Sequence, residues 1–394
     1  MLLQRHFPMV HITTELGEQT VGGVGTCINE LMSVSGDNTG FVHLSQRREP
    51  PVIEGGAIRA GFYDVDVLQA LSFDTVVFHH YGLAYLADPS FPRGRKLVFT
   101  VHSVPTTEPW TLEAPYGSRG DIARSFEACC SRADAIVCVS EAEKGKLLLL
   151  YPELAERTTV IPNGFSSIAA RRKPLSAERR HFGFLGRADY RKNLLELVRV
   201  FRSLEGTLRV ACGEEDPAYA AAVRGEAERV NTAAASIRWC GRLPAREVPD
   251  FLASLDALIV PSRWEPFGYV ALEALRCGVP PLVSRRGGMP DIVGADYRYQ
   301  FDPYDAESFA ETIRLFQNDS AETVRHELEA AIRRSERLTA ERMAEGYERM
   351  AEQLRRERRF TAAAELRRRY AADSAPLRPL PGHASETPLS SPHE

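Results

Sequence analysis

The chain has 394 residues, about two and a half times the usual length of a single domain. Apolar residues make up 44% of it and charged residues 26%, which excludes a mostly disordered, collagen-like or disulfide-stapled chain. The net charge of −4 argues against a strongly basic nucleic-acid binder.

The cysteines and the apolar runs bear on the compartment. The seven cysteines form no Cys-x-x-Cys pair and mostly have apolar neighbours, which favours buried thiols in a reducing compartment. No run approaches the roughly 20 apolar residues of a membrane helix, and residues 1–9 lack the apolar stretch of a signal peptide. We therefore expect a cytoplasmic protein without a transmembrane segment.

Short apolar strands alternate with helical patterns in the first half of the chain. Strands are expected at residues 10–13, 75–79, 96–101, 135–139 and 158–161, and helices at 25–33, 121–132 and 141–151. This alternation indicates a parallel sheet covered on both faces. Residues 1–165 carry a charge of −6 and the remainder +2, which favours neutral or cationic partners for the first half.

The alternation restarts after a polar, basic stretch at 166–180, which we interpret as a linker. Strands are expected at 181–185, 208–212, 237–240, 257–260 and 281–284, and helices at 193–203, 244–254 and 269–277. The sequence thus predicts two doubly wound α/β domains, at 1–165 and 181–339. It further predicts C-terminal helices at 340–370, of which 340–356 crosses back to the first domain, and a disordered tail at 371–394. Ligands of such sheets bind beyond the carboxyl ends of the strands, so the cleft between the domains is the expected site.

The first motif follows the strand that opens the second domain. The strand ends near Gly186, a turn with Arg187 and Lys192 follows, and a helix begins near Asn193. Backbone N–H groups at a helix start attract anions, and the two cationic side chains add donors. The turn is either a diphosphate site or an ordinary solvated basic loop.

The second motif follows the strand at 257–260. Glu265 lies in the loop before Pro266, and Glu273 lies about one turn into the next helix. A carboxylate accepts two hydroxyl hydrogens at once, which suits vicinal sugar hydroxyls. The pair could hold a sugar ring and a ribose at opposite ends of a nucleotide sugar, or be one helix-terminal and one surface acid.

The third motif is the glycine pair Gly287–Gly288 after the strand at 281–284. Such a pair permits positive φ or a close backbone approach. An ordinary strand–helix turn is the alternative.

In this order and spacing the three motifs resemble the C-terminal domain of retaining GT-B glycosyltransferases of family 4. Residues 133–140 and 160–164 resemble the approach to the boundary between the domains. Residues 22–25 resemble the family's N-terminal glycine loop, and residues 100–103 its sugar-site histidine strand. The resemblance covers roughly residues 10–355 and implies a GT-B fold of two Rossmann-like domains.

The resemblance also implies roles for individual residues. Arg187 and Lys192 would bind the donor diphosphate and offset the charge of the leaving group. Glu265 would contact the donor sugar and Glu273 the ribose. His102 would hydrogen-bond the transferred sugar, unless it is simply a satisfied histidine at a strand end. The other implied substrate contacts are Gly23, Val24, Gly186, Arg242, Leu243, Phe267, Gly268 and Tyr269.

Metal and cofactor sites are not expected. The resemblance implies a metal-independent transferase without a cofactor, because fixed cations replace Mg²⁺ at the leaving oxygens. Asp64, in an Asp-x-Asp triplet with Asp66, is interpreted as the N-cap of the next helix. His79, His80 and Tyr81 could contact the acceptor, and a metal is not expected there because no third ligand is evident.

The expected reaction is transfer of a hexosyl unit, with retention, from a nucleoside-diphosphate sugar to a hydroxyl acceptor. A UDP-sugar is the first expectation for the donor, and a soluble small molecule or glycan for the acceptor. Thr26 and Cys27 stand where glycogen and starch synthases carry a basic residue, which argues against an ADP-glucose polymerase. The alternatives are a sugar-nucleotide epimerase of the same fold or a non-catalytic homologue. A dinucleotide oxidoreductase is disfavoured because no Gly-x-Gly-x-x-Gly follows a strand.

Overall fold

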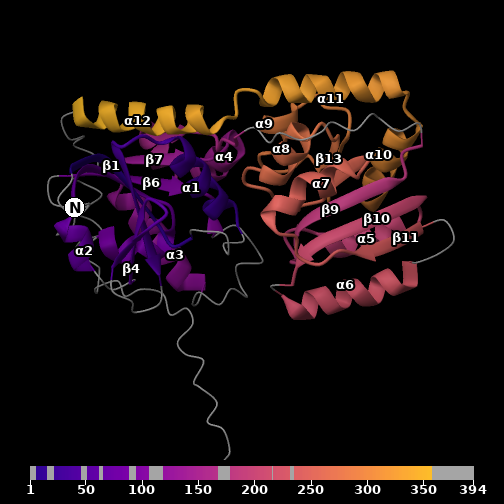
Figure 1. The fold of residues 1–394 in the computed structure, drawn as a ribbon, viewed down its shortest axis with the longest axis horizontal. Coiled ribbons are helices and arrows are strands. Elements are labelled where there is room, and N and C mark those ends of the chain that lie inside the picture. The colour runs from indigo at the N-terminus through magenta and orange to yellow at the C-terminus, as the bar shows by residue number, and fades with distance from the viewer. Residues whose placement is uncertain are drawn as a thin grey trace, which may run out of the picture.

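A computed structural model describes residues 6–15, 22–45, 51–61, 65–87, 95–105, 119–166, 178–214, 216–230 and 235–356. They form two α/β domains with one sheet each (Figure 1). The predictions for the linker and for residues beyond 356 fall largely or wholly outside the described residues.

The N-terminal domain is built on an eight-stranded sheet of order β3-β4-β2-β1-β5-β6-β7-β8, parallel except for the β3–β4 pair. The strands are β1 (His6–Thr13), β2 (Thr39–Ser45), β3 (Val52–Glu54), β4 (Ala57–Gly61), β5 (Ser72–Phe78), β6 (Lys96–Val101), β7 (Ala135–Cys138) and β8 (Thr158–Val160). The helices are α1 (Gly23–Val34), α2 (Val65–Ala70), α3 (Arg119–Arg132) and α4 (Glu141–Leu150), with 3₁₀ turns η2 (Tyr81–Ala87) and η5 (Pro152–Arg157). The parallel strands are apolar along most of their length because both faces of the sheet are covered.

The C-terminal domain has a six-stranded sheet of order β11-β10-β9-β12-β13-β14. The strands are β9 (His181–Arg187), β10 (Gly206–Gly213), β11 (Ala235–Trp239), β12 (Ala257–Val260), β13 (Pro281–Ser284) and β14 (Gln300–Phe301). Its helices are α5 (Leu194–Phe201), α6 (Pro217–Val230), α7 (Val248–Ala253), α8 (Tyr269–Arg276), α9 (Met289–Val293), α10 (Ala306–Asn318) and α11 (Ala321–Ser335), and α12 (Ala340–Arg356) follows them in the chain.

The expected strands of both halves are present, and the differences have local causes. The helix expected at 244–254 is divided into a 3₁₀ turn, η6 (Ala245–Glu247), and α7, whose first turn contains Pro249. Strands β2 to β4 were not predicted. Two of them form the short antiparallel edge hairpin β3–β4, where Val52 and Ile53 are exposed and give no buried-strand pattern.

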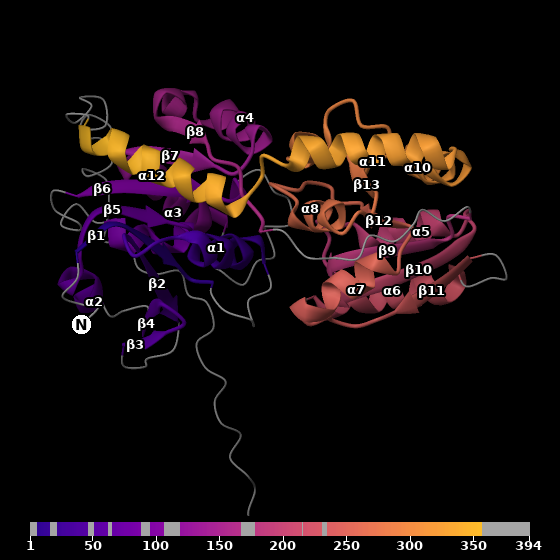
Figure 2. The ribbon, with the colours of Figure 1, turned by 45° about the horizontal axis from the view of Figure 1, so that its top comes forward.

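Helix α12 lies over the N-terminal domain although it follows α11, which packs on the C-terminal domain (Figures 1 and 2). Its Tyr347 hydroxyl is 3.0 Å from the Thr100 hydroxyl on β6, and its Met343 sulfur is 3.7 Å from the Cys27 sulfur on α1. The chain crosses between the domains twice, and the two crossing segments contact each other: the Phe165 N–H donates to the Leu338 carbonyl at 3.2 Å. One apolar cluster therefore runs from the C-terminal core through α12 to α1.

Candidate active site

Lys192 and Glu265 form a buried pair at the carboxyl edge of the C-terminal sheet. Lys192 lies in the turn between β9 and α5, and Glu265 in the loop between β12 and α8. The Lys192 Nζ and Glu265 Oε2 atoms are 2.5 Å apart, and the two side chains are only 14% and 11% exposed. The Ser262 hydroxyl donates a second hydrogen bond, of 3.1 Å, to the same carboxylate oxygen. The first and second motifs of the sequence analysis thus meet in one site.

The Glu265 carboxylate is held in its charged form. Burial alone would raise its pKa, but Lys192, Arg191 and the Ser262 hydroxyl outweigh burial and lower the pKa. Arg191 belongs to the basic turn but was not among the predicted site residues. An ionised Glu265 keeps the Lys192 ammonium in place near the ends of β9 and β12.

The glycine pair supports the loop that carries Glu265. The Gly288 N–H donates to the Glu265 carbonyl at 2.7 Å. Gly287 has a φ of +74°, and a Cβ atom there would lie 2.1 Å from the same carbonyl oxygen. A Cβ atom on Gly288 would lie 2.7 Å from the Pro266 carbonyl oxygen. Only glycine allows this approach, so the third motif supports the backbone of the second.

The start of α8 brings the two domains together. Gly268 precedes α8 with a φ of +115°. The rings of Phe267 and Tyr269 are buried and 5.0 Å apart, so these residues offer the cleft mainly their backbone amides. A Cβ atom on Gly23, the first residue of α1, would lie 3.8 Å from the Tyr269 ring. The glycine loop of the N-terminal domain, with the partly exposed Val24, therefore faces the start of α8.

Glu273 is the fifth residue of α8, just over one turn into the helix, and is partly buried. Among the described residues its carboxylate has no hydrogen-bond or ion-pair partner. Burial, reinforced by the Glu30 carboxylate on α1, raises the pKa of Glu273 to about 7. An acid that is short of partners at this position is suited to accept hydrogen bonds from a ligand.

Arg187 on β9 lies close enough to Glu15 of the N-terminal domain for their charges to interact. The Arg187 guanidinium, one-third exposed, is 3.2 Å from the Asp189 carboxylate. Burial raises the pKa of Glu15, while the Gly25 N–H, Arg187 and Arg191 act to lower it. The Glu15 carboxylate accepts a hydrogen bond of 3.3 Å from the Gly25 N–H, which lies in the first turn of α1. Nothing in the sequence indicated this contact, because Glu15 lies outside every motif.

His102 lies at the carboxyl end of β6 and is linked to two other histidines. Its Nε2 atom is 3.0 Å from His79 Nδ1, and His79 Nε2 is 2.7 Å from His11 Nδ1. Burial lowers the pKa of His102 to about 3 and that of His80 to about 4, so both rings are neutral. His79 is only 1% exposed, so the prediction that it contacts the acceptor is wrong.

One ground for excluding a metal is also overturned. The ligand atoms of Cys27, His79 and His102 lie within 4.8 Å of one another, so a third ligand exists. Burial raises the pKa of the Cys27 thiol to about 12, which keeps it protonated and disfavours a cation there. The Asp64 cap lies outside the described residues.

The remaining predicted contacts lie at or just beyond the carboxyl ends of β9 and β11 in the C-terminal sheet. Gly186, partly exposed, is the penultimate residue of β9. Arg242 is exposed and Leu243 partly exposed in the turn after β11, where Gly241 has a φ of +68°. Their position beyond a strand end suits a contact with a ligand in the cleft.

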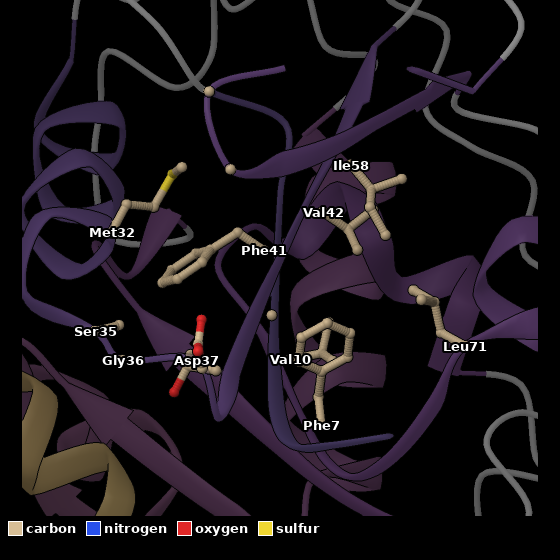
Figure 3. Close-up of a pocket in the computed structure, with 14 residues that line it drawn as sticks. Phe7, Val10, Met32, Ser35, Gly36, Asp37, Phe41, Val42, Ile58 and Leu71 are labelled. Carbon is tan, nitrogen blue, oxygen red and sulfur yellow. The ribbon is translucent and has the colours of Figure 1, made fainter. Parts of the chain in front are cut away.

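A separate hollow of about 270 Å³ lies at the opposite edge of the N-terminal sheet (Figure 3). It is lined mostly by apolar side chains, such as Phe7, Val42 and Ile58, with Asp37 at its side. Phe7 is the second residue of β1, near its amino end, whereas His79 and His102 directly follow the carboxyl ends of β5 and β6. The hollow is therefore not part of the candidate active site.

Comparisons with known proteins identify the family. Residues 167–335 match the family model described as glycosyl transferases group 1, and residues 40–167 match glycosyltransferase family 4. The alpha-maltose-1-phosphate synthase of Mycolicibacterium smegmatis is 24% identical over 76% of this chain and 86% of that protein.

Solved structures share the fold. A sucrose-phosphate synthase from Thermosynechococcus elongatus aligns with a TM-score of 0.72 and 17% identity, over 89% of this chain and 99% of that one. The Escherichia coli trehalose-6-phosphate protein bound to UDP-2-fluoro glucose aligns with a TM-score of 0.68 and 15% identity, over 88% and 99% of the two chains. The fold is GT-B. The chain belongs to the group 1 glycosyltransferases.

Among the described residues, no helix is long and apolar enough to span a bilayer.

Proposed function

We propose that this glycosyltransferase moves a hexosyl unit from a nucleoside-diphosphate sugar to a hydroxyl acceptor, with retention of anomeric configuration and without a divalent metal. The observation that carries the proposal is the Lys192–Glu265 pair at the domain boundary, with Arg187 and Glu273 on neighbouring elements. Two cations and two acids match the parts of a nucleotide sugar: a diphosphate, and hydroxyl groups at either end.

The cations act on the leaving group. As the bond from the anomeric carbon to the diphosphate breaks, negative charge grows on the departing oxygen. Lys192 and Arg187 are fixed near the end of β9, so they stabilise that charge with little reorganisation. They do the work that a bound Mg²⁺ does in metal-dependent transferases.

The acids and His102 orient the two sugars of the donor. Glu273 accepts the ribose hydroxyls, and a free carboxylate with a pKa of about 7 is ready for that role. Glu265 contacts the transferred sugar from the loop that the glycine pair supports. His102 hydrogen-bonds the same sugar from the N-terminal domain, so the reaction needs both domains.

The donor and the acceptor are proposed from weaker signals. We place UDP-sugars first, and the likeness to a structure that holds a UDP-sugar analogue is compatible with that choice. The charge of −6 on residues 1–165 favours a soluble hydroxyl acceptor over an anionic surface.

The test is a hydrolysis screen of UDP-, GDP-, ADP- and dTDP-sugars in EDTA, followed by an acceptor screen with the best donor. We expect release of one nucleoside diphosphate without added metal, and a product with the donor's anomeric configuration by NMR. Conversion of the donor to its epimer without any acceptor would identify an epimerase instead. Strict dependence on Mg²⁺ would refute the metal-free mechanism, and absence of nucleotide-sugar binding would refute the function.

A further inference from the structure

Three histidines form a hydrogen-bonded chain from the core of the N-terminal domain to its carboxyl edge. His11 lies on β1, His79 directly follows β5, and His102 directly follows β6. The His11 and His79 rings are each 1% exposed, whereas His102 is partly exposed at the candidate site. The three-histidine chain therefore connects a fully buried ring to a partly exposed one at the carboxyl edge of the sheet.

The three rings are neutral, and this restricts where their protons lie. Burial lowers the pKa of His11 and His102 to about 3 and also lowers the pKa of His79. A neutral imidazole has one N–H and one acceptor nitrogen. Since His79 bonds to both neighbours, it donates to one and accepts from the other. Only two proton orders remain: all three protons on Nδ1, or all three on Nε2.

The buried end of the chain decides between these orders. His11 Nε2 is buried and has no hydrogen-bond partner among the described residues. The ring of Tyr347 lies edge to face with His11, but its hydroxyl is already bonded to Thr100. A proton on His11 Nε2 would be an orphaned buried donor, with at most a weak ring contact. Orphaned buried donors are rarer than orphaned acceptors, which favours the Nδ1 order.

We infer that His11 and His79 are positioning residues that hold His102 in its Nδ1–H form. His102 Nε2 then accepts from His79, and His102 Nδ1 is left as a fixed donor with no partner among the described residues. Under the proposed function, on which this part of the inference rests, that N–H donates to a hydroxyl oxygen of the transferred sugar. The hydroxyl must then turn its own proton elsewhere, so the chain orients the sugar as well as binding it.

The tautomer can be measured without any donor. We would label the histidines with ¹⁵N, record long-range ¹H–¹⁵N correlations in the full chain with a chelator present, and assign His102 from its Gln variant. We expect the proton of His102 on Nδ1. A proton on Nε2 in the wild-type chain would overturn the inference, and so would a correlation pattern that changes when the chelator is left out, because a metal would then order the ring.

Two variants of His79 make a matched pair. The amide of His79→Gln can donate to one neighbour and accept from the other, whereas His79→Phe can do neither. We expect His102 to stay in the Nδ1–H form in the Gln variant and to become a mixture of tautomers in the Phe variant. An unchanged His102 tautomer in a folded Phe variant would overturn the inference, and the wild-type spectrum still decides if that variant does not fold.

Kinetics separate a positioning role from a merely structural one. We expect His79→Phe to lower kcat about tenfold, the value of roughly one hydrogen bond. The donor KM should stay within about twofold, since the proposed nucleotide contacts lie on the C-terminal domain. His79→Gln should restore kcat, and equal losses in both variants would contradict the inference. A wild-type chain that turns over no donor would refute the proposed function, while the spectra would still decide the tautomer.

Discussion

Breaking the Lys192–Glu265 pair should cost stability as well as activity. Lys192→Met leaves the Glu265 carboxylate buried and charged, with its 2.5 Å partner removed and the Ser262 hydrogen bond remaining. Removing one partner of a buried ion pair costs about 3–5 kcal/mol in the free energy of unfolding. Glu265→Gln leaves the Lys192 ammonium buried without its carboxylate partner. We expect the free energy of unfolding to fall by about 2–4 kcal/mol, less than in Lys192→Met, because a lysine can shed its proton.

The double variant tests the reasoning. Lys192→Met with Glu265→Gln leaves no buried charge, so it should lie within about 1 kcal/mol of the wild type in urea denaturation at pH 7. The two variants that lack Lys192 should lose donor turnover by about 100- to 1,000-fold, because a fixed charge at the leaving oxygen is gone. Glu265→Gln should lose turnover through its lost contact with the transferred sugar. If each single substitution instead lowered the free energy of unfolding by less than about 1 kcal/mol, and the double variant by the sum of the two, the pair would be solvated. That result would refute the electrostatic argument. Wild-type turnover in Lys192→Met would refute the site.

Three further predictions concern single residues. Because the raised pKa of Glu273 favours its protonated form, the free energy of unfolding should fall as the pH rises from about 4.5 through 7. We also expect the donor KM to fall above pH 7, where Glu273 is ionised. In Glu273→Gln the loss of stability should be smaller, and the fall of the donor KM should vanish in steady-state kinetics. Gly268→Ala should destabilise the chain by about 1–3 kcal/mol and lower kcat, because φ is +115° and the new Cβ would lie 1.9 Å from the Met289 methyl group. The control is Gly225→Ala in α6, where nothing lies within 4 Å of the new Cβ. It should be neutral or slightly stabilising in the same thermal and kinetic assays. Glu15→Gln removes a carboxylate that faces the basic turn, so donor KM should fall about two- to fivefold, and a higher KM would show that Glu15 aids binding.

Most strands of each half, the two-domain plan and the motifs at strand ends followed from the sequence. Apolar strands that alternate with helices specify doubly wound sheets because both faces must be buried. The contact between Lys192 and Glu265 was expected only as proximity, since both follow strands that end at the same edge of one sheet. Local pattern suffices for such features because strand direction fixes which loops share an edge.

Which side chains lie beside one another was decided by the tertiary structure alone. Glu15 lies close enough to the basic turn to sense its charges, and Cys27 lies beside His79 and His102, although each set is far apart in the sequence. The burial of His79 likewise could not be predicted, since a strand-end histidine has the same local sequence whether it faces solvent or core. Charge, tautomer and pKa depend on what surrounds a side chain in space, and the spacing of residues along the chain does not contain that information.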